Sequence, residues 1–156
     1  AGCEQVIAID IDPFKLKLAK ELGATHSLHA TDENVATKVL GLTDGVGVDI
    51  GMEVVGKTAP LRTAIDCVRL GGQVGLVGNL QPNVDLPLQK VVTRELKLVG
   101  SCGSSGEYPR CIELMASGEI KVSPLISRVT SLDRGPEFFQ RLYEHEPELL
   151  KVVVQP

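Results

Sequence analysis

Short β-branched runs alternate with helix-type patterns along the whole sequence, and this alternation restricts the possible folds more than any other feature. The first run, residues 6–10, is apolar until Asp10, which suits a strand buried on both faces that reaches the surface at its carboxyl end. Directly afterwards, Asp12 can cap a helix, and Pro13 suits the first helical position because no N–H is needed there. Gly23 then ends this helix. This order predicts parallel strands connected by helices.

The rest of the chain continues the pattern. We predict further strands at residues 26–29, 50–55, 73–77, 96–102, 125–130 and 150–154. We predict helices at residues 13–22, 32–42, 88–93, 108–117 and 136–145, and one that begins at Lys57 or Thr58 and ends at Gly71 and Gly72. The predicted fold class is α/β, a Rossmann-type doubly wound parallel sheet. Residues 1–122 are expected to form a partial dinucleotide-binding domain, and residues 123–156 a C-terminal strand–helix–strand segment.

Composition excludes several classes of protein. A net charge of -4, with both signs mixed along the chain, provides no basic stripe for nucleic acid. No apolar run approaches the ~20 residues that cross a bilayer, so we expect no membrane contact and a cytoplasmic location. The cysteines lack zinc-finger spacing, which favours buried free thiols over a metal site. They are Cys3, Cys67, Cys102 and Cys111.

Asp10 is the first candidate for ligand binding, because doubly wound sheets bind ligands at the carboxyl ends of their strands. Both of its carboxylate oxygens are expected to be free for the hydroxyls of a ribose. Asp12 follows and no arginine is near, so charge repulsion of a 2′-phosphate favours NAD over NADP. The pattern leaves two alternatives open: Asp10 could only cap a turn, and Lys15, which could reach the same ribose, could only be solvated.

A dinucleotide fold also needs a glycine loop about 20 residues before the ribose acid. Only nine residues precede Asp10, so we expect the glycine loop, its strand and the first helix to lie upstream. We also expect the strand of Asp10 not to close directly on the strand at residues 50–55. Gly45 and Gly47 are the nearest match to the loop, but they lead into a strand and are interpreted as a plain turn.

Four motifs in order resemble the medium-chain, zinc-dependent alcohol/polyol dehydrogenase family. They are residues 6–26, 47–56, 70–78 and 94–101, which look like the second strand and helix and the fourth, fifth and sixth strands of that family. The resemblance implies the coenzyme-binding portion of an NAD enzyme that passes hydride between an alcohol or polyol carbon and the nicotinamide. Zinc would then lie in an N-terminal catalytic domain outside this chain, which the segment at residues 123–156 would rejoin. We therefore expect the chain alone to be inactive.

The resemblance also implies roles for single positions. Asp10 and Lys15 would bind the adenosine ribose, and Val54 and Val55 would flank the adenosine. The nicotinamide side would be lined by Val77, Gly78 and Asn79, and the carboxamide would contact backbone groups of Ser101, Cys102 and Gly103. Lys151 would lie near the pyrophosphate. An edge-strand lysine is the alternative for Lys151. Val84, Asp85 and Leu86 match a short edge strand that pairs subunits into homodimers or homotetramers. Gly103 and Ser104 depart from the larger residues of the sorbitol-type branch, so the alcohol is not specified.

Rival classes differ in how well they fit. A short-chain dehydrogenase is excluded, because Tyr108 and Tyr143 are followed four residues later by Ile112 and Pro147 where that class needs lysine. A methyltransferase would also need its glycine loop before Asp10. A zinc-free quinone or enoyl reductase, and a non-catalytic nucleotide-binding or interaction module, remain open alternatives.

Overall fold

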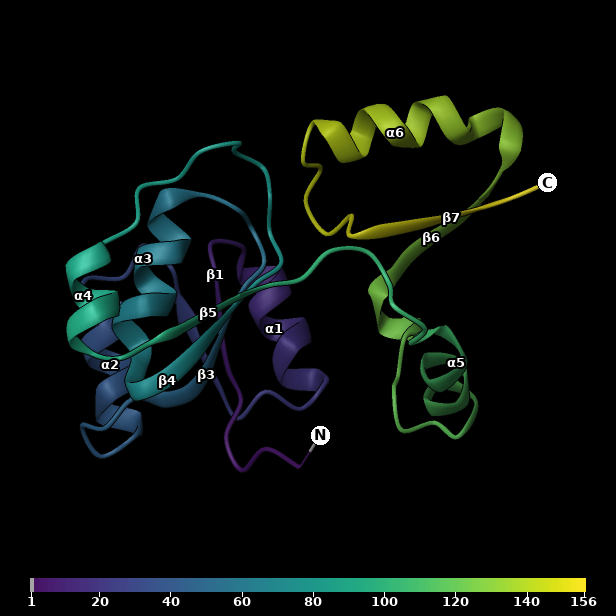
Figure 1. The fold of residues 1–156 in the computed structure, drawn as a ribbon. Coiled ribbons are helices and arrows are strands. Elements are labelled where there is room, and N and C mark those ends of the chain that lie inside the picture. The colour runs from purple at the N-terminus through teal and green to yellow at the C-terminus, as the bar shows by residue number, and fades with distance from the viewer. Residues whose placement is uncertain (1) are drawn as a thin grey trace. The chain divides into compact units, whose positions relative to one another are not determined.

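The computed structural model describes residues 2–156, which form an α/β structure with parallel strands (Figure 1). The strands are β1 (Ile7–Asp10), β2 (His26–His29), β3 (Val48–Glu53), β4 (Val68–Leu76), β5 (Lys97–Gly100), β6 (Ile126–Ser131) and β7 (Lys151–Gln155). The helices are α1 (Pro13–Glu21), α2 (Val35–Leu42), α3 (Thr58–Cys67), α4 (Leu88–Thr93), α5 (Tyr108–Ala116) and α6 (Gly135–Tyr143), with 3-10 turns at Ser123–Leu125 and Leu132–Arg134.

The strands form three parallel sheets, with the orders β1-β2, β3-β4-β5 and β6-β7. In a doubly wound sheet of order 3-2-1-4-5-6, β1 and β2 correspond to positions 2 and 3, and β3, β4 and β5 to positions 4, 5 and 6. Each pairing of these five strands is therefore one that the predicted fold requires. The strand of Asp10 and the strand β3 belong to different sheets, as expected.

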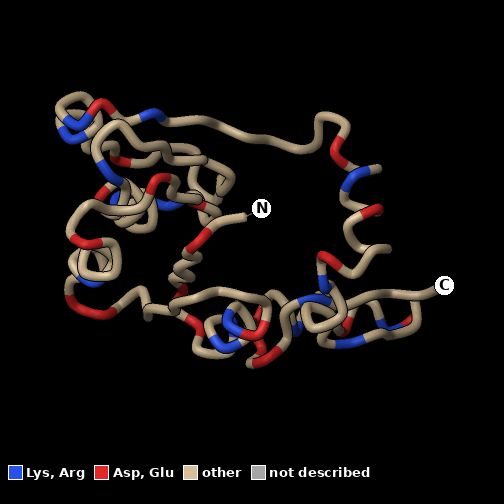
Figure 2. Tube along the Cα trace, turned by 90° about the horizontal axis from the view of Figure 1, so that it is seen from below, with Lys and Arg blue, Asp and Glu red and all other residues tan. Residues whose placement is uncertain are grey.

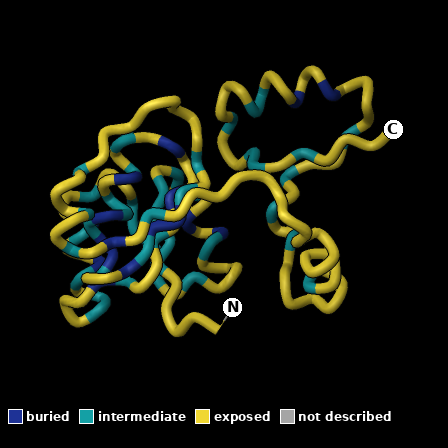
Figure 3. Tube along the Cα trace, in the orientation of Figure 1, coloured by how far each residue is buried: buried dark blue, intermediate teal, exposed yellow. Residues whose placement is uncertain are grey.

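The chain divides into two compact units, one formed by Thr31–Ser104 and the other by the described residues up to Ala30 together with Ser105–Pro156. In the first unit, α3 packs on the β3-β4-β5 sheet through a core in which Ile65, Val68 and Val74 are fully buried (Figure 3). The Arg94 guanidinium donates hydrogen bonds to the carbonyls of Ile65 and Val68, at the end of α3. This core holds β3, β4 and β5 in register.

The end of α3 corrects one prediction. The helix ends at Cys67 rather than at Gly71 and Gly72, because β4 already begins at Val68. The pairing jumps from Val48 with Val68 to Ile50 with Gln73, so the residues between form a bulge. Gly71 has φ +69 in this bulge, a conformation that favours glycine.

The expected edge strand at Val84, Asp85 and Leu86 is not a strand in this structure. The Asp85 N–H donates to the Thr58 hydroxyl at 3.1 Å, and its carboxylate lies 3.7 Å from Arg62. Helix α2 also begins later than predicted, at Val35, because Asn34 takes a left-handed conformation with φ 59.

In the other unit, α1 packs on the β1-β2 pair, and β6, α6 and β7 form a parallel β-α-β segment. Asp12 caps α1 as predicted, because its carboxylate accepts from the Phe14 N–H at 2.9 Å. Acidic and basic residues are mixed along the trace in Figure 2. No helix among the described residues is long and apolar enough to cross a membrane.

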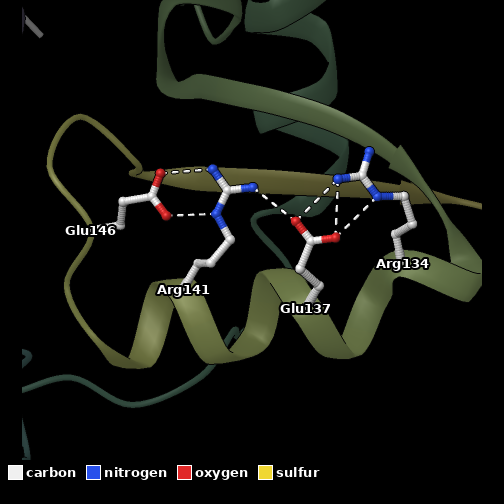
Figure 4. Close-up of polar contacts among 4 residues, drawn as sticks. All are labelled: Arg134, Glu137, Arg141 and Glu146. Atoms are coloured by element: carbon white, nitrogen blue, oxygen red, sulfur yellow. Dashed lines mark hydrogen bonds and ion pairs between the residues drawn. The ribbon is translucent and has the colours of Figure 1, made fainter.

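Helix α6 carries a line of ion pairs that runs from Arg134 through Glu137 and Arg141 to Glu146 (Figure 4). Arg141 binds Glu146 through two nitrogens at 2.5 and 2.7 Å, and this pairing holds the pKa of Glu146 below its usual 4.5. The hydrogen bond from Arg134 likewise lowers the pKa of Glu137. The Arg141 guanidinium also lies 4.4 Å from the ring centre of the buried Phe138. The network therefore connects Glu146, in the loop that follows α6, to the helix itself.

Candidate functional site

A cleft of about 410 Å³ lies at the carboxyl ends of β4 and β5, within the unit Thr31–Ser104. Its lining residues are Leu76, Val77, Gly78, Asn79, Gly100, Ser101, Cys102 and Gly103. For six of these eight residues, the family resemblance implied contact with the nicotinamide side or with the carboxamide. The structure thus brings two separately predicted groups of residues into one cleft.

Parallel strand pairing explains why these groups meet. Leu76 and Gly100, the last residues of β4 and β5, are register partners, so the loops that follow both strands start at the same sheet edge. The Ser101 N–H donates to the Leu76 carbonyl at 2.9 Å and extends the pairing by one residue. The space beside Gly100 and Gly103 is open, since a Cβ at either position would meet no atom within 4 Å.

A second strand end supports the wall of this cleft. We name residues 54–56, directly after β3, the β3 turn, and residues 77–79, directly after β4, the β4 turn. The N–H groups of Val77 and Gly78 donate to the Glu53 carbonyl at 2.8 and 3.1 Å, and the Leu80 N–H donates to the Val55 carbonyl at 3.3 Å. The predicted adenosine-flanking residues of the β3 turn therefore lie beside the predicted nicotinamide-side residues of the β4 turn.

The two turns touch backbone to backbone. A Cβ on Gly56 would lie 2.5 Å from the Gly78 carbonyl carbon, and one on Gly78 would come well under 3.0 Å from backbone atoms of Val55 and Gly56. Gly56 also has φ +79, which favours glycine for a second reason. Close packing of the two turns therefore requires glycine at both positions.

Sequence reasoning missed Glu53, the last residue of β3. Its side chain is only 4% exposed, and its carboxylate accepts hydrogen bonds from the N–H groups of Val55 and Gly56 at 2.8 to 3.0 Å. The predicted strand at residues 50–55 placed Glu53 inside a strand, whereas β3 runs from Val48 to Glu53, so that Glu53 lies at a carboxyl strand end as Asp10 does. An acid in that position indicates either a ligand contact or a bound turn.

Asp10 ends β1 in the other compact unit, and one expectation about it is wrong. Its Oδ1 accepts the Asp12 N–H at 2.9 Å, so its two oxygens are not both free. A carboxylate oxygen has two lone pairs, which leaves further capacity for ribose hydroxyls. The turn is also bound by His29, whose Nε2 donates to the Ile11 carbonyl at 2.8 Å. Lys15 is exposed on the first turns of α1.

Lys151 is the first residue of β7, and it is exposed. It lines a second hollow of about 520 Å³, together with mainly apolar residues such as Ile126, Leu142 and Val152. A role of Lys151 near a pyrophosphate stays a prediction.

The cysteines differ from the expectation of buried thiols. Only Cys67 is buried, and burial raises the pKa of its thiol to about 11. Cys3, Cys102 and Cys111 are exposed and free, and Cys102 lines the cleft. Among residues 2–156, no group of three or more histidine, cysteine and acidic side chains could hold a metal ion.

Residues 1–117 match the family model of the zinc-binding dehydrogenases. The chain belongs to this family. The match confirms the predicted resemblance, and the cleft lies within the matched residues.

Individual relatives agree with this assignment. The chain is 30% identical to the sorbitol dehydrogenase of Bacillus subtilis over 156 residues, which are 99% of the chain and 44% of that enzyme. The solved structure of (2R,3R)-butanediol dehydrogenase from Bacillus subtilis matches 100% of the chain and 45% of its own length, with a TM-score of 0.90 and 26% identity. A zinc-binding dehydrogenase of Sinorhizobium meliloti bound to NADP matches 100% of the chain and 46% of its own length, with a TM-score of 0.88 and 28% identity.

The chain therefore spans less than half the length of these relatives. The relatives named here are oxidoreductases by description. One of them carries NADP, so the preference for NAD that the sequence predicts belongs to the proposal below.

Proposed function

We propose that this chain holds the coenzyme of a zinc-dependent dehydrogenase that passes hydride between an alcohol or polyol carbon and the nicotinamide of NAD. The observation that carries the proposal is the cleft, in which the β4 turn and residues 101–103 meet at the sheet edge where doubly wound folds bind ligands. When bound, the nicotinamide supplies the hydride acceptor or donor. The residues of this chain orient the ring and exclude water from one of its sides.

The cleft fits such a ring in size and in chemistry. Its volume of about 410 Å³ lies within the range of small-molecule sites, and the open space beside Gly100 and Gly103 suits a flat group. Val77 supplies apolar surface, since it is 43% exposed. Backbone groups of residues 101–103 are proposed to bind the carboxamide, and Val54 and Val55 to flank the adenosine.

We assign the adenosine ribose to Asp10, with Lys15 beside it. Asp10 keeps acceptor capacity on both oxygens besides the hydrogen bond from the Asp12 N–H, and the carboxylate of Asp12 follows two residues later. A 2′-phosphate would meet negative charge at this turn, which supports NAD as the coenzyme. The pyrophosphate is assigned to Lys151 and to a glycine loop outside this chain.

Zinc, the alcohol or polyol and the subunit contact complete the proposal. Residues 1–122 would form the coenzyme domain, and residues 123–156 would rejoin a catalytic domain that binds zinc. The protein would be cytoplasmic, and this chain alone would be inactive. Homodimers or homotetramers would form through Val84, Asp85 and Leu86, whose apolar members are 40% and 41% exposed in the single chain. Pairing with a second copy would then order residues 84–86 as the edge strand that they do not form in the single chain.

The test is a titration of the natural-length protein with NADH and NADPH, followed by nicotinamide fluorescence. The protein should bind NADH more tightly, and Asp10→Ala should weaken NADH binding by about 1.5–3 kcal/mol, the value of hydrogen bonds to a charged group. Glu113→Ala, an exposed carboxylate change on α5, is the matched control and should leave binding unchanged. Absence of binding would overturn the proposal. Tighter binding of NADPH, or an unchanged Asp10→Ala variant, would overturn the assignment of Asp10.

A further inference from the structure

Glu53 is the one polar or charged side chain that is buried among the described residues. Burial of a carboxylate is unfavourable unless hydrogen bonds compensate it. Here the compensation comes wholly from a local turn, because Oε1 accepts from the N–H groups of Val55 and Gly56 while Oε2 accepts from Gly56. The carboxylate therefore binds the β3 turn from inside the fold.

The β3 turn passes this constraint to the cleft. Gly56 and Gly78 allow the backbones of the two turns to touch, and the Gln81 N–H donates to the Gly56 carbonyl at 3.0 Å. The backbone of Glu53 adds a second connection, since its carbonyl accepts from Val77 and Gly78, which line the cleft. One residue thus binds the β3 turn through its side chain and the β4 turn through its main chain.

We propose that Glu53 is a positioning residue for the dinucleotide coenzyme, which sets the place of the β4 turn by fixing the β3 turn against it. This inference rests on the proposed function, because it assumes that the cleft binds the nicotinamide part of a dinucleotide. Glu53 itself does not line the cleft and acts through Val77, Gly78 and Asn79.

A carboxylate is needed for this role because both of its oxygens accept. In Glu53→Gln, one accepting oxygen is replaced by an NH₂ group, which faces at least the Gly56 N–H and cannot accept a hydrogen bond from it. The shape of the side chain is nearly unchanged, so packing is preserved while the β3 turn loses an acceptor. Glu53→Asp keeps the charge but shortens the reach to Gly56.

The first experiment compares NADH dissociation constants of the unmodified natural-length protein, Glu53→Gln and the control Asp49→Asn. The control makes the same carboxylate-to-amide change on the same strand, where Asp49 is exposed and pairs with Arg69 at 2.6 Å. We expect Glu53→Gln to weaken NADH binding roughly tenfold, equivalent to about 1.4 kcal/mol, and Asp49→Asn to change it less than about twofold. Equal affinity of Glu53→Gln and the unmodified protein would overturn the inference and leave the proposed function intact. Failure of the unmodified protein to bind NADH would instead refute the proposed function.

A second readout separates positioning from general stabilisation. Asn79→Ala removes an exposed side chain of the β4 turn, and we combine it with Glu53→Gln in a double-mutant cycle on the NADH dissociation constant. If Glu53 acts through the β4 turn, the double variant should lose less affinity than the product of the two single losses. A fully multiplicative loss would show that Glu53 stabilises the fold without positioning the cleft. Should Glu53→Gln not fold, Glu53→Asp takes its place in the same cycle with the same two outcomes.

Discussion

The contact between Gly56 and Gly78 provides the sharpest test of how the cleft is built. We consider Gly78→Ala, which adds a single methyl group between two backbones. The new Cβ would come well under 3.0 Å from main-chain atoms of Val55 and Gly56, and main-chain atoms cannot rotate away as a flexible side chain can. The two turns must therefore separate.

The size of the effect follows from what the separation breaks. Overpacking in a close contact costs about 1–3 kcal/mol. Separation also weakens the hydrogen bond from the Gln81 N–H to the Gly56 carbonyl, which contributes about 0.5–1.5 kcal/mol. We expect Gly78→Ala to lower the free energy of unfolding by about 2–4 kcal/mol.

The assay is urea unfolding followed by circular dichroism, with Gly100→Ala as the matched control. Gly100 lines the same cleft, but a Cβ there meets no atom within 4 Å and its φ lies outside the left-handed region. The control should stay within about 0.5 kcal/mol of the unmodified protein, while Gly78→Ala should unfold at a urea concentration lower by on the order of 1 M. Equal midpoints for the two alanine variants would refute the backbone contact as we describe it.

Three further predictions concern the rest of the molecule. Iodoacetamide at about pH 8 should alkylate Cys3, Cys102 and Cys111 in the native protein but Cys67 only after unfolding. The reason is that burial raises the pKa of Cys67 to about 11. Mass spectrometry that finds Cys67 modified first would contradict this. Bound NADH should slow alkylation of Cys102 but not of Cys111, and equal slowing of both thiols would argue against a coenzyme in the cleft. The lowered pKa of Glu146 means that its pairing with Arg141 stabilises the fold above the usual pKa of 4.5 and is lost as the pH falls through the lowered pKa. Arg141→Gln should therefore show less acid destabilisation below pH 4.5 in urea midpoints than the unmodified protein does, and parallel curves would count against the network in Figure 4.

The sequence by itself determined the elements and the family. Strand and helix patterns depend on residues close together in the chain, so β1, β2, α1 and the β6-α6-β7 segment lie within one or two residues of their predicted positions. The order of the elements also predicted the strand neighbours, because doubly wound folds connect parallel strands in few ways. The cleft residues from 77 to 79 and from 101 to 103 could be assigned through the motifs of the family.

Only the tertiary structure decided how these pieces are held. Glu53 is an acidic residue whose burial no sequence pattern indicated, and Gly56 and Gly78 lie 22 positions apart in the chain yet touch in the fold. The same holds for the bulge at Gly71, the hydrogen bond that occupies one oxygen of Asp10, and the exposure of three of the four cysteines. Each of these features depends on which groups the folded chain brings close together, and local sequence patterns do not specify those distances.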